Sequence, residues 1–166
     1  MSFPYTLRKA LPNDLPAIVN IYNSTIPGRM ATADIEPVSV DSKVNWLNAH
    51  TDKRPLWVVT SNEGIIAWIS FSNFYGRPAY QATSELSIYI LTEYRGKGLG
   101  KFLLQYALDK APALGIKNVL GFIFGHNIPS LQLFYGFGFE QWALLPGVAN
   151  LDGVERDLVI LGKKLF

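Results

Sequence analysis

Hydrophobic and polar residues alternate most clearly over residues 82–90 of the chain. Leu86, Ile88 and Ile90 lie on one side of this pattern, and Glu85 lies on the other. Because successive side chains of a strand point to opposite faces of a sheet, the alternation predicts a strand with one buried face. A glycine-rich turn and then an apolar helix follow this strand directly in the sequence.

Shorter patterns predict the remaining elements of the fold. Apolar residues at helical spacing predict four helices, which begin near positions 13, 40, 100 and 127 and end near positions 25, 50, 111 and 136. Strands are predicted over residues 3–7, 56–60, 65–74, 82–90, 119–124, 140–145 and 156–165. Two long loops are expected, over residues 28–38 and residues 146–155. This order of elements predicts a mixed α/β sheet with helices on both faces.

Composition limits the class of protein. The 166 residues fit a single domain, residues 1–166, and a hydrophobic content of 49% indicates a globular chain. A net charge of +2 is too small for a protein that binds nucleic acid through its phosphates, so no nucleic-acid partner is expected. No apolar stretch is long enough for a signal peptide or a membrane span, which favours a cytoplasmic protein without a membrane partner.

Metal and thiol chemistry are not expected. The chain contains no cysteine, which excludes disulfides, thiolate nucleophiles and cysteine zinc sites. His50 and His126 have no acidic or histidine partner at the spacing of metal ligands, so no metal site is predicted. For His126, helix capping or packing is the simpler role.

The glycine-rich turn reads RGKGLG and covers residues 95–100. Glycines let backbone N–H groups approach a ligand, and the start of the following helix adds partial positive charge. A Walker A loop is excluded because Lys101 is followed by Phe102, and a dinucleotide fingerprint is excluded because the glycines are spaced as GxGxG. The sequence therefore predicts an anion site, with Glu85 a few residues upstream as a candidate base.

Two motifs carry a resemblance to a known family. Arg95, Gly98 and Gly100 fit the acetyl-CoA motif R/Q-x-x-G-x-G/A of the GNAT superfamily of N-acetyltransferases. Asn127 and Ser130, followed by a Gly-Phe pair, fit the second motif of that superfamily at the start of a helix. Two motifs in this order with a strand between them are more specific than either alone, so the sequence resembles a GNAT enzyme.

This resemblance implies a fold and a cosubstrate. The fold would be a twisted, mixed and mostly antiparallel sheet of about six or seven strands flanked by about four helices. Acetyl-CoA would be the cosubstrate, with its pyrophosphate on the glycine turn and its pantetheine arm along the preceding strand. The residues that the resemblance assigns to this cofactor site are Ile88, Tyr89, Ile90, Arg95, Gly96, Lys97, Gly98, Leu99, Gly100, Lys101, Asn127 and Ser130.

A closer resemblance covers essentially the whole chain. Residues 83–90 read TSELSIYI and are similar to the corresponding strand of the phosphinothricin or L-amino acid N-acetyltransferase subgroup. The resemblance implies transfer of the acetyl group of acetyl-CoA to the primary amine of a small molecule. An amino acid or an analogue such as phosphinothricin, methionine sulfoximine or methionine sulfone is the expected acceptor. Members of the subgroup are commonly dimers, so a homodimer is also expected.

Glu85 is the candidate catalytic residue. It matches the catalytic glutamate of the subgroup, which implies a general base acting through a water molecule. Without the resemblance, a lone glutamate on an alternating strand is most often an outward, solvated residue. The resemblance also implies that a backbone N–H near Ile88 or Tyr89 stabilises the tetrahedral oxyanion.

The proton donor for the departing thiolate is where the sequence departs from the family. The position that commonly carries Tyr, or His in the subgroup, is Phe134, for which core packing is the simpler role. Tyr135 and Tyr89 are alternative donors, although one helical step of about 100° turns Tyr135 away from the direction of Phe134. Water is the third alternative.

The resemblance to the subgroup also implies that the acceptor pocket lies beside the loop that precedes the catalytic strand. Arg77, with Phe74 and Tyr80 nearby, is a candidate clamp for an acceptor carboxylate, and a solvated surface arginine is the alternative. Further candidates for the same pocket are Arg29, Met30 and Thr32.

Other functions stay open at this point. One alternative is a related enzyme that acetylates a peptide N-terminus or a polyamine. Another is a non-catalytic acyl-CoA-binding sensor that keeps the same fold. A polyamine pocket should be acidic, whereas the two acceptor loops hold two acidic residues beside two arginines, which favours an acceptor with its own carboxylate. Glu85 argues against a sensor, and Phe134 argues for one.

Overall fold

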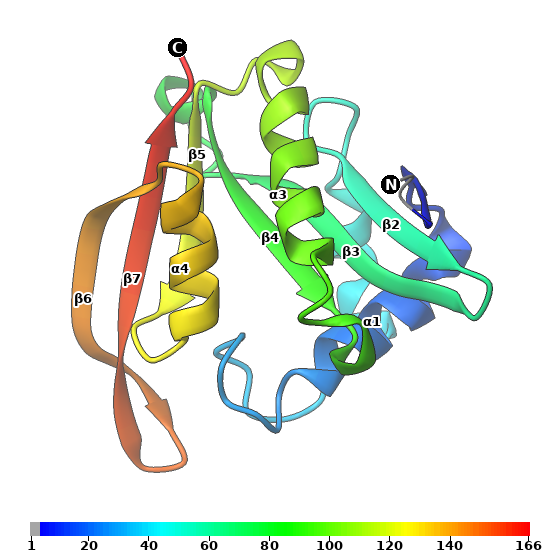
Figure 1. Cartoon of the computed structure of the whole chain (residues 1–166), viewed down its shortest axis with the longest axis horizontal. Helices are drawn as coiled ribbons and strands as arrows, with labels where there is room; N and C mark the ends of the chain where they lie inside the picture. The colour runs from blue at the N-terminus through cyan, green and yellow to red at the C-terminus, as the bar shows by residue number, and fades with distance from the viewer. Residues whose placement is uncertain (1–3) are drawn as a thin grey trace.

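A sheet of seven strands runs through the computed structural model, which describes residues 4–166 (Figure 1). The strands are β1 (Thr6–Lys9), β2 (Leu56–Ser61), β3 (Gly64–Asn73), β4 (Thr83–Ile90), β5 (Asn118–Phe124), β6 (Glu140–Leu151) and β7 (Val154–Lys164). They follow the order β1-β2-β3-β4-β5-β7-β6. Every neighbouring pair is antiparallel except β4 and β5, which are parallel. The predicted mixed, mostly antiparallel sheet is therefore confirmed.

Helices cover both faces of this sheet. The α-helices of the described residues are α1 (Leu15–Ser24), α2 (Val44–Asn48), α3 (Leu99–Lys110) and α4 (Ile128–Gly136). In Figure 1, α3 and α4 lie in front of the sheet, and α1 lies behind it. Side chains of α2 pack into the same hydrophobic core as those of α1. The prediction of helices on both faces is confirmed.

The central strands are buried on both sides, which divides the interior into two cores. Trp57 and Val59 of β2 belong to the core beneath α3, whereas Leu56 and Val58 belong to the core beneath α1. Side chains of a strand alternate between the two faces, so a strand covered on both sides reads as an unbroken apolar run. The sequence LWVV has this form.

Two predicted boundaries differ from the structure. The first strand is Thr6–Lys9 instead of residues 3–7, and Phe3 lies outside the described residues. The second helix is only Val44–Asn48, preceded by a single 3-10 turn, Asp41–Lys43. Short helices depend on tertiary contacts, and Trp46 and Leu47 are the residues of this helix that pack against the core.

The loop predicted over residues 146–155 is wrong, because β6 continues to Leu151 and a tight turn at Asp152 and Gly153 leads directly into β7. Pro146 and Gly147 lie where the register between β6 and β7 shifts. Such residues usually mark loops, but a β-bulge also accommodates them, because the ladder is interrupted there. The Gly147 N–H donates to the Asp157 carboxylate (2.9 Å).

The sheet opens between its two parallel strands. Thr83 to Glu85 of β4 pair with Asn118 to Leu120 of β5, and no pairing between these strands follows. β4 continues to Ile90 beside β3, while β5 continues to Phe124 beside β7. The ends of β4 and β5 therefore diverge, and each leaves one edge without a strand partner.

Candidate active site

A cleft of about 1030 Å³ fills the opening between β4 and β5. Its walls are the ends of these two strands, the start of α4, residues 30–33 of the long loop and residues 148–151 of β6. In Figure 1 the long loop, coloured light blue, lies across the lower end of this opening. Nine of the predicted catalytic and cofactor residues line the cleft: Glu85, Ile88, Tyr89, Ile90, Arg95, Gly96, Gly100, Asn127 and Ser130.

The phase of the β3–β4 ladder determines which backbone groups of β4 face the cleft. The Leu91 N–H donates to Ile66 of β3 (3.0 Å), so Leu91 and alternate residues before it direct their backbone groups toward β3. The backbone N–H of Tyr89 therefore faces β3. The N–H and C=O of Ile88 face the open side, and the Ile90 carbonyl there accepts a bond from Arg95 Nε (2.9 Å). Ile88 is thus the residue that presents a free N–H at mid-strand.

The turn after β4 exposes backbone donors. Gly96 and Gly98 have left-handed φ angles of 70° and 85°, which non-glycine residues rarely adopt. No side chain caps α3, so the first N–H groups of this helix have no partner within it. An anion bound here would accept hydrogen bonds from these N–H groups and would be stabilised by the positive end of the helix dipole.

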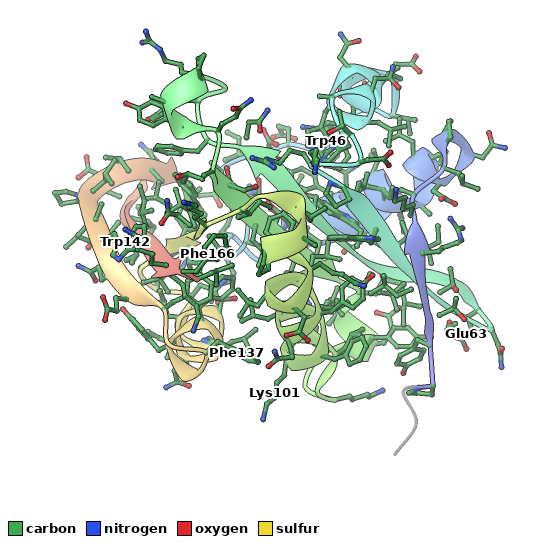
Figure 2. All side chains as sticks on the ribbon, turned by 90° about the horizontal axis from the view of Figure 1, so that it is seen from above. Trp46, Glu63, Lys101, Phe137, Trp142 and Phe166 are labelled. Atoms are coloured by element: carbon green, nitrogen blue, oxygen red, sulfur yellow. The ribbon has the colours of Figure 1, made fainter. Side chains whose placement is uncertain are left out.

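Lys97 of the turn and Lys101 of α3 do not line the cleft. Lys101 is exposed and points away from the molecule in Figure 2, and the Lys97 ammonium lies 5.7 Å from the centroid of the Tyr94 ring. Leu99 is buried in the core. Leu99 therefore reaches the anion site only through its backbone, as the uncapped first turn of α3 allows.

Asn127 connects α4 to the long loop. Its side-chain oxygen accepts the Ser130 N–H (3.3 Å), which caps the helix, and its amide nitrogen donates to the Met30 carbonyl (3.0 Å). The neighbouring His126 ring contacts the Arg29 carbonyl through Nε2 (2.8 Å). Both ends of the Asn127 amide are therefore occupied by the chain, and the residue holds the loop at the rim of the cleft.

Glu85 lies where β4 and β5 separate. It occupies the last paired position of β4, opposite Leu120, and its side chain shares a face with Ser87 and Tyr89. Burial raises the pKa of the Glu85 carboxyl group. The carboxylate also contributes to a raised pKa of the Tyr89 hydroxyl, after the larger effects of burial and of Tyr22. A carboxylate with a raised pKa is a stronger base than a solvated one, as proton abstraction requires.

A smaller pocket, of about 170 Å³, opens on the face of the sheet that carries Glu85. We refer to it as the side pocket, and its lining residues are Ile18, Val19, Tyr22, Val38, Lys43, Trp46, Trp68, Ser87 and Tyr89. It shares Ser87 and Tyr89 with the cleft. The sequence did not indicate Lys43 or this pocket, because its residues come from α1, the long loop, the 3-10 turn, α2, β3 and β4 and form no local motif.

The sequence profile of the acetyltransferase (GNAT) family matches residues 15–139. The chain belongs to this family. The matched segment begins at α1 and ends just after α4, so it includes the cleft, the glycine turn and Glu85. The resemblance inferred from the two motifs is confirmed, and the protein is an acetyl-CoA-dependent N-acetyltransferase.

Individual relatives extend this likeness over nearly the whole chain. YwnH of Bacillus subtilis strain 168, named as a candidate phosphinothricin acetyltransferase, is 55% identical over 161 residues, which are 96% of this chain and 99% of YwnH. An L-methionine sulfoximine/L-methionine sulfone acetyltransferase of Pseudomonas paraeruginosa is 29% identical over 94% of this chain and 92% of its own.

A solved GNAT structure shows the same fold. The phosphinothricin acetyltransferase of Sinorhizobium meliloti, crystallised with acetyl-CoA, superimposes with a TM-score of 0.90 at 30% identity. The match covers 98% of this chain and 89% of that protein. The GNAT fold predicted from the sequence is confirmed.

Position 134, where a general acid is expected in this family, is occupied by phenylalanine, whose side chain has no proton to donate. Phe134 is 6% exposed, and its ring packs so closely on Gly121 that a methyl group added there would lie 2.7 Å from it. Tyr135 is 45% exposed and does not line the cleft. Tyr89 does line it, but its hydroxyl donates to the Ala31 carbonyl (3.3 Å) and has a raised pKa because it is buried.

The predicted acceptor residues are divided by the structure. Phe74 and Tyr80 form an aromatic cluster, with ring centroids 5.5 Å apart, and Arg77 is exposed between them. None of these three residues lines the cleft or the side pocket. Met30 and Thr32 do line the cleft, whereas the Arg29 guanidinium binds Asp152 on the β6–β7 turn.

The described residues contain neither a membrane-spanning helix nor a cluster of metal-ligand side chains. Among residues 4–166, no helix is both long enough and apolar enough to cross a membrane. Within the same range, no three His, Cys, Asp or Glu side chains gather as metal ligands would.

Proposed function

We propose that this GNAT enzyme acetylates the primary amine of a small amino acid or a close analogue, such as phosphinothricin or methionine sulfoximine. The observation that supports this most directly is the position of Glu85. A half-buried carboxylate with a raised pKa lies at the point where β4 leaves its partner strand β5, near the free backbone N–H of Ile88. The names of the relatives support the acceptor class.

Acetyl-CoA fits the donor groups along the cleft. The N–H groups of the glycine turn and of the uncapped α3 start would hold its pyrophosphate, and the open edge of β4 at Ile88 and Ile90 would bind its pantetheine arm. Gly96, Gly100 and Ser130 line this part of the cleft. When bound, acetyl-CoA supplies an activated thioester.

Glu85 removes the proton that blocks the acceptor nitrogen. The carboxylate accepts this proton from the acceptor ammonium through one water molecule, which frees a lone pair to attack the acetyl carbon. The Ile88 N–H donates a hydrogen bond to the oxyanion that forms as the new C–N bond closes. The nitrogen then releases its second proton to water and the C–S bond breaks, and the departing thiolate takes a proton from water because Phe134 has none to give. The products are an N-acetylated acceptor and free CoA.

We also propose that residues 1–166 form a single domain and that the enzyme is a cytoplasmic homodimer. Support for self-association comes from β6, which is an edge strand of the sheet. Trp142, Leu144 and Val148 of this strand are 46%, 49% and 57% exposed. An edge strand with exposed apolar side chains favours pairing with a second copy.

The decisive experiment is to measure thiol release from acetyl-CoA with a panel of amino acids, amines and short peptides. We expect turnover with amino acids or their analogues, and a loss of about 100-fold or more in kcat for Glu85→Gln. Glu140→Gln is the matched control, because this glutamate is exposed at the start of β6. Binding of CoA without turnover of any acceptor would contradict the proposal.

A further inference from the structure

The side pocket continues the cleft on the acceptor side of β4. Glu85, Ser87 and Tyr89 point to the same face of this strand, and the last two line both cavities. Successive side chains on one face of a strand are about 7 Å apart, so Ser87 is one step from the base. A small acceptor whose amine lies beside Glu85 would extend into the side pocket.

Packed aromatic rings form much of the wall of the side pocket. Trp68 and Tyr89 stack with ring centroids 4.5 Å apart at 19°, and the Trp46 ring lies 5.3 Å from Trp68. The Trp68 indole N–H donates to the Ile18 carbonyl (3.1 Å), which fixes its orientation. Figure 2 shows Trp46 between α2 and the sheet. These contacts hold the rings of Trp46, Trp68 and Tyr89 in place along the pocket wall.

Lys43 is the one charged residue among those that line the side pocket. Its ammonium lies 5.3 Å from the centroid of the Tyr22 ring, and no carboxylate of the described residues is within ion-pair distance of it. The nearby Asp34 carboxylate accepts a bond from the Tyr22 hydroxyl, which also contacts Thr32. A cation without an acidic partner at an aromatic pocket favours an anionic ligand.

We propose that the side pocket binds an anionic group of the acceptor, and that the Lys43 ammonium pairs with it while the acceptor amine lies beside Glu85. The inference rests on the proposed acetyl transfer and narrows its substrate class. It selects amines that carry an oxyanion, either the α-carboxylate or a distal group such as a phosphinate, over polyamines. A volume of about 170 Å³ also excludes long peptides from this pocket, since a cavity of about 150 Å³ holds one benzene.

Paired acceptors test this assignment. L-Leucine and isopentylamine differ only in the α-carboxylate, and L-phosphinothricin and L-methionine sulfoximine differ chiefly in the charge of the distal group. We expect Lys43→Met to lower kcat/KM by about 10-fold or more for the member of at least one pair that carries the additional oxyanion, since a charged hydrogen bond is lost. The member of that pair without this oxyanion and the KM for acetyl-CoA should change little. The pair that responds identifies which oxyanion Lys43 binds.

Two further variants separate charge from packing. Lys43→Arg should keep most of the preference, because the positive charge is retained. Lys110→Met is the matched control, since its ammonium also lies 5.3 Å from an aromatic centroid, that of Tyr106 on α3, and it lines neither cavity. A uniform loss over all acceptors, or no loss, in Lys43→Met would overturn the inference.

A binding measurement distinguishes failure of this inference from failure of the proposed function. Trp46 and Trp68 line the side pocket, so tryptophan fluorescence reports occupancy without turnover. Quenching by the anionic member of a pair that is lost in Lys43→Met supports the pocket even if no acetyl transfer occurs. If acceptors are acetylated but Lys43→Met binds both members of each pair as the wild type does, the pocket assignment is wrong and the enzyme assignment stands.

Discussion

Arg29 and Asp152 join two distant segments across the rim of the cleft. Arg29 Nε lies 2.7 Å from one carboxylate oxygen of Asp152, and a terminal guanidinium nitrogen lies 3.1 Å from the other. A second bond set from the same guanidinium reaches the carbonyls of Ile26 and Ile35. With the bonds from His126 and Asn127, this ion pair holds the long loop against the β6–β7 turn.

We expect Asp152→Asn to weaken acceptor binding more than acetyl-CoA binding. The Arg29 guanidinium holds the pKa of Asp152 below its usual range, so the ion pair persists at neutral pH. Without it, the loop residues that line the acceptor side become less ordered, and the acceptor KM should rise several-fold. The acceptor KM of the wild type should also rise with ionic strength, because salt screens the exposed Arg29–Asp152 ion pair. Steady-state kinetics at low and high salt measure both effects.

The control for this prediction is Lys9→Met, which removes another exposed ion pair. Lys9 pairs with Asp52, and neither residue lines the cleft or the side pocket. Its acceptor KM should equal that of the wild type. An equal rise in the KM values for acceptor and acetyl-CoA in Asp152→Asn would show that the loop does not act on the acceptor alone.

Glu85 should produce opposite pH effects on activity and stability. Its raised pKa means that kcat/KM rises with pH as the carboxyl group loses its proton, and Glu85→Gln should lack this rise. Because the folded-state pKa exceeds the unfolded one, the unfolded state releases the proton first, and stability falls as pH rises through this interval. Glu85→Gln should therefore melt at a higher temperature than the wild type at neutral pH. A lower melting temperature would contradict the raised pKa.

A methyl group at Gly121 should disturb the point where the strands separate. It would lie 2.7 Å from the buried Phe134 ring, and we expect Gly121→Ala to lower the free energy of unfolding by about 1–3 kcal/mol. Adding Phe134→Leu should recover part of this loss, which a double-mutant cycle by denaturant unfolding would detect. Gly162→Ala is a useful comparison, because its nearest neighbour is the half-exposed Trp142 ring, which can move aside.

Acid should destabilise the fold through His50. Burial lowers the pKa of this imidazole, and its Nε2 is buried without a hydrogen-bond partner. The unfolded chain takes up the proton first, so stability falls as pH drops below about 6.5. Thermal melts across this range should show a smaller pH dependence in His50→Asn than in the wild type. Equal slopes in the two proteins would exclude His50 as the source.

Much of the fold follows from local sequence pattern. The alternation from Leu86 to Ile90 predicted β4, the apolar run LWVV predicted β2, and the glycine turn predicted the start of α3. These patterns can be read from the sequence because strand and helix periods are short compared with the elements that carry them. The same stretch, with its second motif at Asn127, was sufficient to predict the family.

The details of the site depended on the tertiary structure. The pairing of β4 with β3 and its separation from β5 decide which backbone N–H of β4 is free. The sequence of β4 alone predicts neither of these. Pro146 and Gly147 read as a loop, but pairing with β7 makes their segment a strand and a wall of the cleft.

The acceptor side shows the same division most clearly. The resemblance to the subgroup made Arg77, one loop before Glu85, the candidate acceptor cation, whereas the structure leaves Arg77 outside both cavities and brings Lys43 to the side pocket. Sequence alone does not reveal the lining of the side pocket, because the pocket is formed by elements that pack together from distant parts of the chain. The sequence by itself determined the chemistry of the strand and its turn, and packing of α1 and α2 on the sheet decided which cation lines the side pocket.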